Sequence, residues 1–160
     1  MSKKVGRFLV LFIFVAIVCA GVSAFSTPQA HATTCQPGST GDSVCTGQDP
    51  VDTGCANNVS NVASTILNPG NGSNLNDMWS ATTPSCETNW PQANIYYDFF
   101  NAYTLSVSRD AGGGLSARTI SASVSDCAEG CYGNMVYAPT QPTEACITGN
   151  YNACAKQPGY

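Results

Sequence analysis

Positive charge and histidine are scarce in this sequence. Its 160 residues include six Lys or Arg and one His, against ten Asp or Glu. Lys3, Lys4, Arg7 and His31 all fall within the first 32 residues, so the remaining chain has three cations and a net charge of −7. Such a surface repels phosphate backbones, which bind to clustered Lys and Arg. Nucleic acid and anionic membrane surfaces are therefore not expected partners.

The lack of histidine also restricts catalysis after residue 32. No imidazole is left to act as the general base for a serine or cysteine nucleophile. A Ser–Lys pair would have to use Lys156, close to the C-terminus. The sequence thus argues against nucleophile–histidine enzymes.

Long apolar runs are also absent, with one exception behind the basic N-terminus. The run from Phe8 to Cys19 is typical of the core of a signal peptide and is shorter than the roughly 20 residues that span a bilayer. Small residues favour cleavage after Ala32, with cleavage after Ala24 as the alternative. We expect a signal peptide over residues 1–32 and one secreted, extracytoplasmic domain over 33–160, without stable membrane insertion.

Cysteine, in contrast, is abundant after residue 32. The eight cysteines of this part are Cys35, Cys45, Cys55, Cys86, Cys127, Cys131, Cys146 and Cys154. An even number in an exported chain predicts disulfides rather than a metal site. Local spacing pairs Cys127 with Cys131, and a short hairpin loop over residues 149–151 would place Cys146 opposite Cys154. By elimination, Cys35 pairs with Cys45 and Cys55 with Cys86.

The clearest secondary-structure signal is an apolar alternation from Ile95 to Val107. A period of two predicts a half-buried strand, with Tyr97 and Phe99 facing the core. Asp98 and its even-numbered neighbours would then lie on the polar face.

A second alternating stretch includes Ile120 and Val124 and follows a glycine cluster. If residues 110–113 form the connecting loop, Tyr103 lies opposite Ile120 and Phe99 lies opposite Val124. Both apolar sets then share one face of a hairpin.

The rest of the chain is less periodic. Residues 33–50 read as loop and 68–76 as a turn, while 57–66 fit either a helix or a strand. Together these signals predict an all-β or β-rich fold, a small disulfide-stapled antiparallel sheet or sandwich-like domain with long loops.

Three cysteine-containing stretches carry a family likeness: CTGQDPVDTGC at 45–55, SCETNW at 85–90 and EACITGNYNAC at 144–154. In their order they resemble the bacterial domain of unknown function 2690 family. The basic positions of that family are replaced here by Asp77–Ser80 and Trp90–Gln92. The resemblance implies an exported module without an assigned activity, and we expect Trp90 to pack over a disulfide.

Carboxylates are the only catalytic groups that the composition favours. A glycoside hydrolase needs two of them in one cleft, and the candidates are Asp98, Asp110, Glu87 and Asp126. The preferred interpretation of Asp98 is a solvated strand residue, so no catalytic residue is assigned.

Calcium is the one metal with any support. Asp42, Asp49 and Asp52 cluster in a loop and offer the oxygen ligands that calcium takes. The DxDxDG pattern is missing, so ordinary turn aspartates are the preferred interpretation and no cofactor is expected.

Aromatic residues supply the remaining hypothesis. Tyr96 and Phe100 share the parity of Asp98 and would form an exposed interaction face if Tyr97 and Phe99 face the core. We therefore expect a non-catalytic extracellular or cell-envelope binding module, with envelope polysaccharide or a protein as its partner. A carboxylate-based hydrolase acting on envelope polysaccharide is the alternative.

Overall fold

The computed structural model describes residues 35–38, 40–80, 85–97 and 101–158. They belong to one compact unit, Thr33–Tyr160. Their helical elements are short: α2 (Asp42–Cys45), η1 (Cys55–Asn57) and η2 (Cys127–Glu129). Their strands are β1 (Val59–Asn68), β2 (Ser73–Ser80), β3 (Thr88–Asn94), β4 (Ala102–Arg109), β5 (Arg118–Ser125), β6 (Cys131–Tyr132), β7 (Val136–Tyr137), β8 (Thr143–Thr148) and β9 (Ala153–Lys156).

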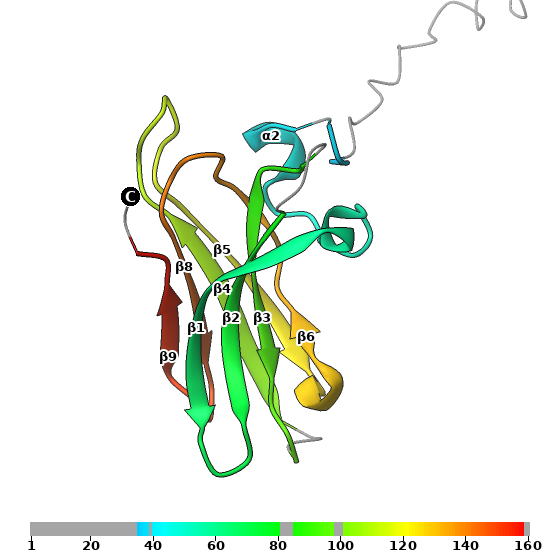
Figure 1. Cartoon of the computed structure of the whole chain (residues 1–160), viewed down its shortest axis with the longest axis vertical. Coiled ribbons are helices and arrows are strands. Elements are labelled where there is room, and N and C mark those ends of the chain that lie inside the picture. Colours follow the sequence, from blue (N-terminus) through cyan, green and yellow to red (C-terminus); the bar gives the residue numbers. More distant parts are fainter. Residues whose placement is uncertain (1–34, 39, 81–84, 98–100, 159–160) are drawn as a thin grey trace, which may run out of the picture. The chain divides into compact units, whose positions relative to one another are not determined.

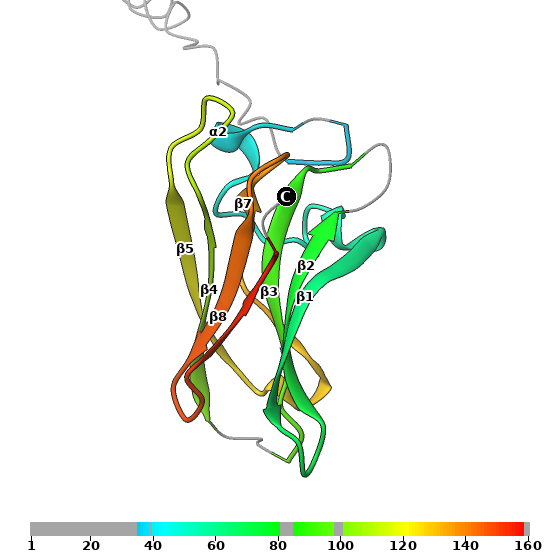
Figure 2. The same cartoon turned by 60° about the vertical axis from the view of Figure 1, so that its left-hand side comes forward.

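The strands form two antiparallel sheets that pack face to face (Figures 1 and 2). The first sheet has the order β1-β2-β3-β6, with β7 also paired to β3, and the second has the order β5-β4-β8-β9. Leu75 and Ile95 from the first sheet's side meet Tyr103, Leu105 and Ile147 of the second in the main core. The predicted β-rich, sandwich-like class is therefore confirmed.

Residues 57–66, for which helix and strand remained open, form most of β1. This strand pairs with β2 and is largely exposed or half-buried. The turn predicted over residues 68–76 is present but shorter, because β2 already begins at Ser73. The Asn68 side chain accepts a hydrogen bond from Gly70 N, and Asn68 O accepts one from Gly72 N. An edge position explains the weak periodicity, because neither face of β1 is fully covered.

The predicted single strand from Ile95 to Val107 is wrong in its first half. β3 ends at Asn94, Tyr97 adopts a φ of 69°, and β4 begins at Ala102. The Tyr96 amide donates to Ser73 Oγ, and Tyr96 O accepts from the Asn71 side chain. The alternation therefore spans the passage from one sheet to the other, and Tyr97, expected in the core, is 83% exposed.

The predicted β4–β5 hairpin exists, but its expected register is wrong. Tyr103 pairs with Val124, and Arg109 pairs with Arg118. The loop thus covers residues 110–117 and contains its own bridge between Gly112 and Leu115. The four extra loop residues shift the register by an even number, so the same side chains still face the core. Phe99 lies outside the described residues.

The disulfides join Cys35 to Cys45, Cys55 to Cys86, Cys127 to Cys131 and Cys146 to Cys154. These are the four pairs that the sequence analysis named. Cys146 and Cys154 lie directly opposite each other in β8 and β9. The first two bridges are neighbours, with 3.7 Å between Cys35 Sγ and Cys55 Sγ, and the buried Trp90 packs in the same cluster. This is the placement expected of Trp90.

Candidate functional site

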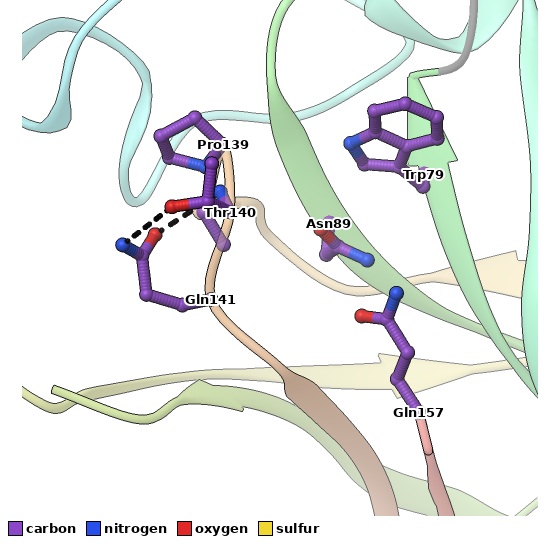
Figure 3. A pocket seen from close by; sticks show the side chains of 7 residues that line it. Trp79, Asn89, Pro139, Thr140, Gln141 and Gln157 are labelled. Carbon is purple, nitrogen blue, oxygen red and sulfur yellow. Dashed lines mark hydrogen bonds between the residues drawn. The ribbon is translucent and has the colours of Figure 1, made fainter. Parts of the chain in front are cut away.

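A polar pocket opens at one end of the sandwich, between the two sheets. Its lining residues are Trp79, Asn89, Ala138, Pro139, Thr140, Gln141 and Gln157. Figure 3 shows Asn89 and Gln157 between Trp79 and the segment Thr140–Gln141. The cavity volume is about 20 Å³, far below the roughly 300–1,000 Å³ of sites that enclose drug-sized ligands. Among the residues that line it in the described chain, none is charged.

Backbone pairing fixes the two sides of this pocket. Trp79 of β2 lies directly opposite Asn89 of β3. On the other side, Gln141 Nε2 donates to Gly112 O at 3.0 Å and to Thr140 Oγ1 at 3.1 Å. A Cβ atom at Gly113 would lie 2.7 Å from Gln141 Nε2, and Gly113 has a φ of 54°, so glycine is needed there. The loop between β4 and β5 thus holds Gln141 in place.

A buried carboxyl group lies next to the pocket. Asp77 of β2 is 0% exposed; one of its oxygens accepts from Asn89 Nδ2 at 3.1 Å and the other from Thr143 Oγ1 at 2.6 Å. Thr143 Oγ1 is also 3.2 Å from Gln157 Oε1. Burial raises the pKa of Asp77 to about 6, and the two hydrogen bonds offset part of that effect. The cluster of Asp77, Asn89, Thr143 and Gln157 links both sheets.

Sequence reasoning missed this cluster and its pocket. The available signal was a polar residue at core parity, since Ser73, Leu75 and Asp77 alternate inward along β2. A buried Asp that has lost solvent and has neutral partners is a functional-site candidate on physical grounds.

The predicted interaction face is placed only in part. Tyr96 is 44% exposed, as expected, and Tyr97 beside it is more exposed still. Phe100 lies outside the described residues. Since β3 runs from Thr88 to Asn94, the two tyrosines lie beyond the end of the strand remote from Asn89. This aromatic pair is separate from the pocket.

Of the four carboxylates considered for hydrolysis, the three that the structure describes fall in different places. Asp98 lies outside the described residues. Asp126 directly follows the last residue of β5 and precedes η2. Glu87 precedes β3 and accepts hydrogen bonds from Tyr137 Oη at 2.9 Å and Thr40 Oγ1 at 3.1 Å. Burial, with Glu87 as a further cause, raises the pKa of Tyr137.

Asp110 is the fourth of these carboxylates and lines a second small pocket. Glu144 and Lys156 line the same pocket. Lys156 pairs directly with Glu144 across β8 and β9. The structure therefore groups Asp110 with a carboxylate that the sequence analysis did not consider.

The aspartates considered for calcium have other partners. Asp42 binds Arg109 Nη1 at 2.6 Å and Arg118 Nη1 at 3.3 Å, and the Arg109 hydrogen bond is the largest cause that lowers its pKa to about 2. Asp49 Oδ1 accepts the amides of Val51 and Asp52 and shapes a turn. In the described ranges, two clusters of side chains have the spacing of metal ligands, and every cysteine in them is already part of a disulfide.

The fold and the pocket define a disulfide-stapled antiparallel β-sandwich with an uncharged polar pocket between its sheets. Comparisons with protein-family models, with curated proteins and with solved structures give no match. The resemblance to the domain of unknown function 2690 family therefore stays a prediction. In the part of the chain that the structure describes, no helix has the length and apolar character of a membrane span.

Proposed function

We propose that this domain is a secreted, non-catalytic binding module of the cell envelope or its surroundings, and that its pocket binds an uncharged, hydroxyl-rich ligand such as the end of a polysaccharide chain. The observation that carries the proposal is the combination of an aromatic ring with amide side chains in an uncharged pocket. Amides both donate and accept hydrogen bonds, and an indole covers the apolar face of a ring.

The basic, apolar N-terminus and the disulfides support export, because disulfides persist in oxidising compartments. The disulfides also support a binding role, since they hold the strands that carry the pocket. N-terminal sequencing of the exported protein would distinguish cleavage after Ala32 from cleavage after Ala24.

Binding to soluble neutral and acidic envelope glycans, measured by calorimetry, tests the ligand class. We expect neutral glycans to bind, and Trp79→Ala to weaken binding about tenfold, the equivalent of about 1.4 kcal/mol. Tyr97→Ala is the matched control, because it removes an exposed aromatic side chain outside the pocket. Equal losses in both variants, or a preference for acidic glycans, would contradict the proposed site.

The same glycans test the hydrolase alternative. A hydrolase would release new reducing ends, and that activity would depend on two carboxyl groups across a cleft. A binding module leaves the glycan intact. Release that disappears in Asp110→Asn or Glu144→Gln would replace the binding proposal with an enzyme at the second pocket.

A further inference from the structure

Thr143 and Gln157 face each other inside the sandwich. Glu144 pairs with Lys156 across β8 and β9, so the adjacent residues, Thr143 and Gln157, lie opposite each other. The amide of Gln157 donates a hydrogen bond to Thr143 O at 2.9 Å. Thr143 is 2% exposed and Gln157 is 9% exposed. The hydroxyl oxygen of Thr143 lies 3.2 Å from the carboxamide oxygen of Gln157. A nucleophile and an acyl group are thus held in contact.

Asp77 completes the arrangement from the other sheet. Its carboxyl oxygen lies 2.6 Å from Thr143 Oγ1, on a residue with no exposed surface. Asn89 Nδ2 holds the second carboxyl oxygen and so fixes the orientation of the group. A base, a hydroxyl group and a carboxamide therefore follow one another in a buried row, and these are the three groups that acyl transfer to a hydroxyl uses.

We propose that Thr143 and Gln157 form an intramolecular ester cross-link between β8 and the end of the chain after β9. The bond from Thr143 Oγ1 to Gln157 Cδ forms, and the bond from Cδ to Nε2 breaks. Asp77 accepts the hydroxyl proton and delivers a proton to the departing nitrogen, which leaves as ammonia. The chain loses one ammonia molecule, and the reaction needs no oxidant, reductant or second substrate.

The environment favours both formation and survival of this bond. A carboxamide is a weak electrophile, but holding the groups in contact replaces a bimolecular encounter by an intramolecular step. Burial raises the pKa of Asp77 to about 6, which makes it a stronger base than a solvated carboxylate. The same burial limits the access of water that would hydrolyse the ester. Gln157 also lines the pocket, which offers the ammonia a way out.

The cross-link would protect an edge strand. β9 lies at the edge of the second sheet and is joined to β8 by Cys146–Cys154 near the hairpin turn. An ester between Thr143 and Gln157 would close the other end of the same strand pair. The last strand could then not peel away from the sheet, even after reduction of the disulfide.

Intact-mass spectrometry of the purified, fully reduced protein tests the proposal. We expect a mass one ammonia molecule below that calculated for the sequence of the mature chain, whose first residue is established by the N-terminal sequencing. Trypsin cleaves after Arg118 and Lys156, so residues 157–160 should stay attached to the peptide that contains Thr143. Hydroxylamine, which cleaves esters, should release them. A full sequence mass, or free release of residues 157–160 without hydroxylamine, would overturn the proposal.

Three variants separate this ester from other losses of ammonia. Thr143→Val removes the nucleophile and Asp77→Asn removes the base, and both should show the full sequence mass. Thr143→Ser keeps a hydroxyl group and should restore the loss. A succinimide at Asn71–Gly72 would lose the same mass but would persist in Thr143→Val, and that result would refute the cross-link. The mass measurement does not involve glycan binding, so the two proposals can fail separately; the ester would leave Asn89 and Gln141 as the amides of the pocket.

Discussion

Asp77 and Asp42 are the same kind of side chain in two regions of one domain, yet their pKa values move in opposite directions. Asp77 lies between the sheets with the neutral donors Asn89 and Thr143, and burial raises its pKa to about 6. Asp42 begins α2 with a side chain that is 28% exposed, and Arg109 leads the causes that lower its pKa to about 2. Burial with neutral partners at Asp77 and a cationic partner at the partly exposed Asp42 make the difference, not the number of hydrogen bonds.

The opposite pKa shifts indicate different roles for the Asp42 region and the Asp77 region. The Asp42 region joins α2 to β4 and β5 through two guanidinium groups, which suits a fixed structural contact. The Asp77 region keeps a carboxyl group without a cation among its hydrogen-bond partners, at a cost in stability at neutral pH. A group of this kind is suited to proton transfer, which is the role that the proposed ester assigns to Asp77.

Removal of Arg109, the main partner of Asp42, should have the largest effect on the free energy of unfolding. Its side chain is fully buried and also donates to the carbonyl oxygens of Tyr137 and Ser116. Arg109→Met leaves these two carbonyl acceptors without this donor and takes from Asp42 its closest cation, so the free energy of unfolding should fall by about 3 kcal/mol. Urea unfolding at neutral pH measures the change. The control is Arg118→Met, whose partly exposed pair should contribute less than about 1 kcal/mol; equal losses would contradict the assignment.

The second prediction is that titration of Asp77 makes the free energy of unfolding depend on pH. Its pKa is about 6 in the folded protein and 3.8 without the fold. Folding therefore favours the protonated form, and the stability gained from it is complete below pH 3.8 and lost as the pH rises through about 6. The free energy of unfolding should fall by about 3 kcal/mol across this window. Asp77→Asn, which mimics the neutral acid, should flatten the curve; an unchanged slope would show that Asp77 is not its source.

Parts of the fold could be predicted because they depend on neighbouring residues. Cys127–Cys131 and Cys146–Cys154 follow from short spacing, and the core faces of β4 and β5 follow from alternation. The β4–β5 register could not be predicted, because the bridge between Gly112 and Leu115 lengthens the loop without a clear sequence signal. The end of β3 could not be predicted either, since the alternation continues through Tyr96 and Tyr97 while the backbone turns.

The candidate site also has one part that could be predicted from the sequence and one part that could not. With Cys146 opposite Cys154, three further steps along the pair place Thr143 opposite Gln157, so this half of the site is implicit in the cysteine spacing. Asp77 comes from the other sheet, and no local pattern states which strands will face each other. Contacts between sheets depend on packing of the whole core, which one sequence pattern does not report.

Titration of Asp42 should have the smallest effect on the free energy of unfolding, and this effect should appear at acid pH. Its pKa falls from 3.8 to about 2 on folding, so its contribution is present above pH 3.8 and is lost as the pH falls through about 2. Because the side chain is partly exposed, solvent screening limits the contribution to roughly 1 kcal/mol. Asp42→Asn should remove the acid decline without altering the Asp77 window between pH 3.8 and about 6. A change in that upper window would mean that the two regions are coupled, and the opposite pKa shifts would then have to be treated as one titrating system rather than two.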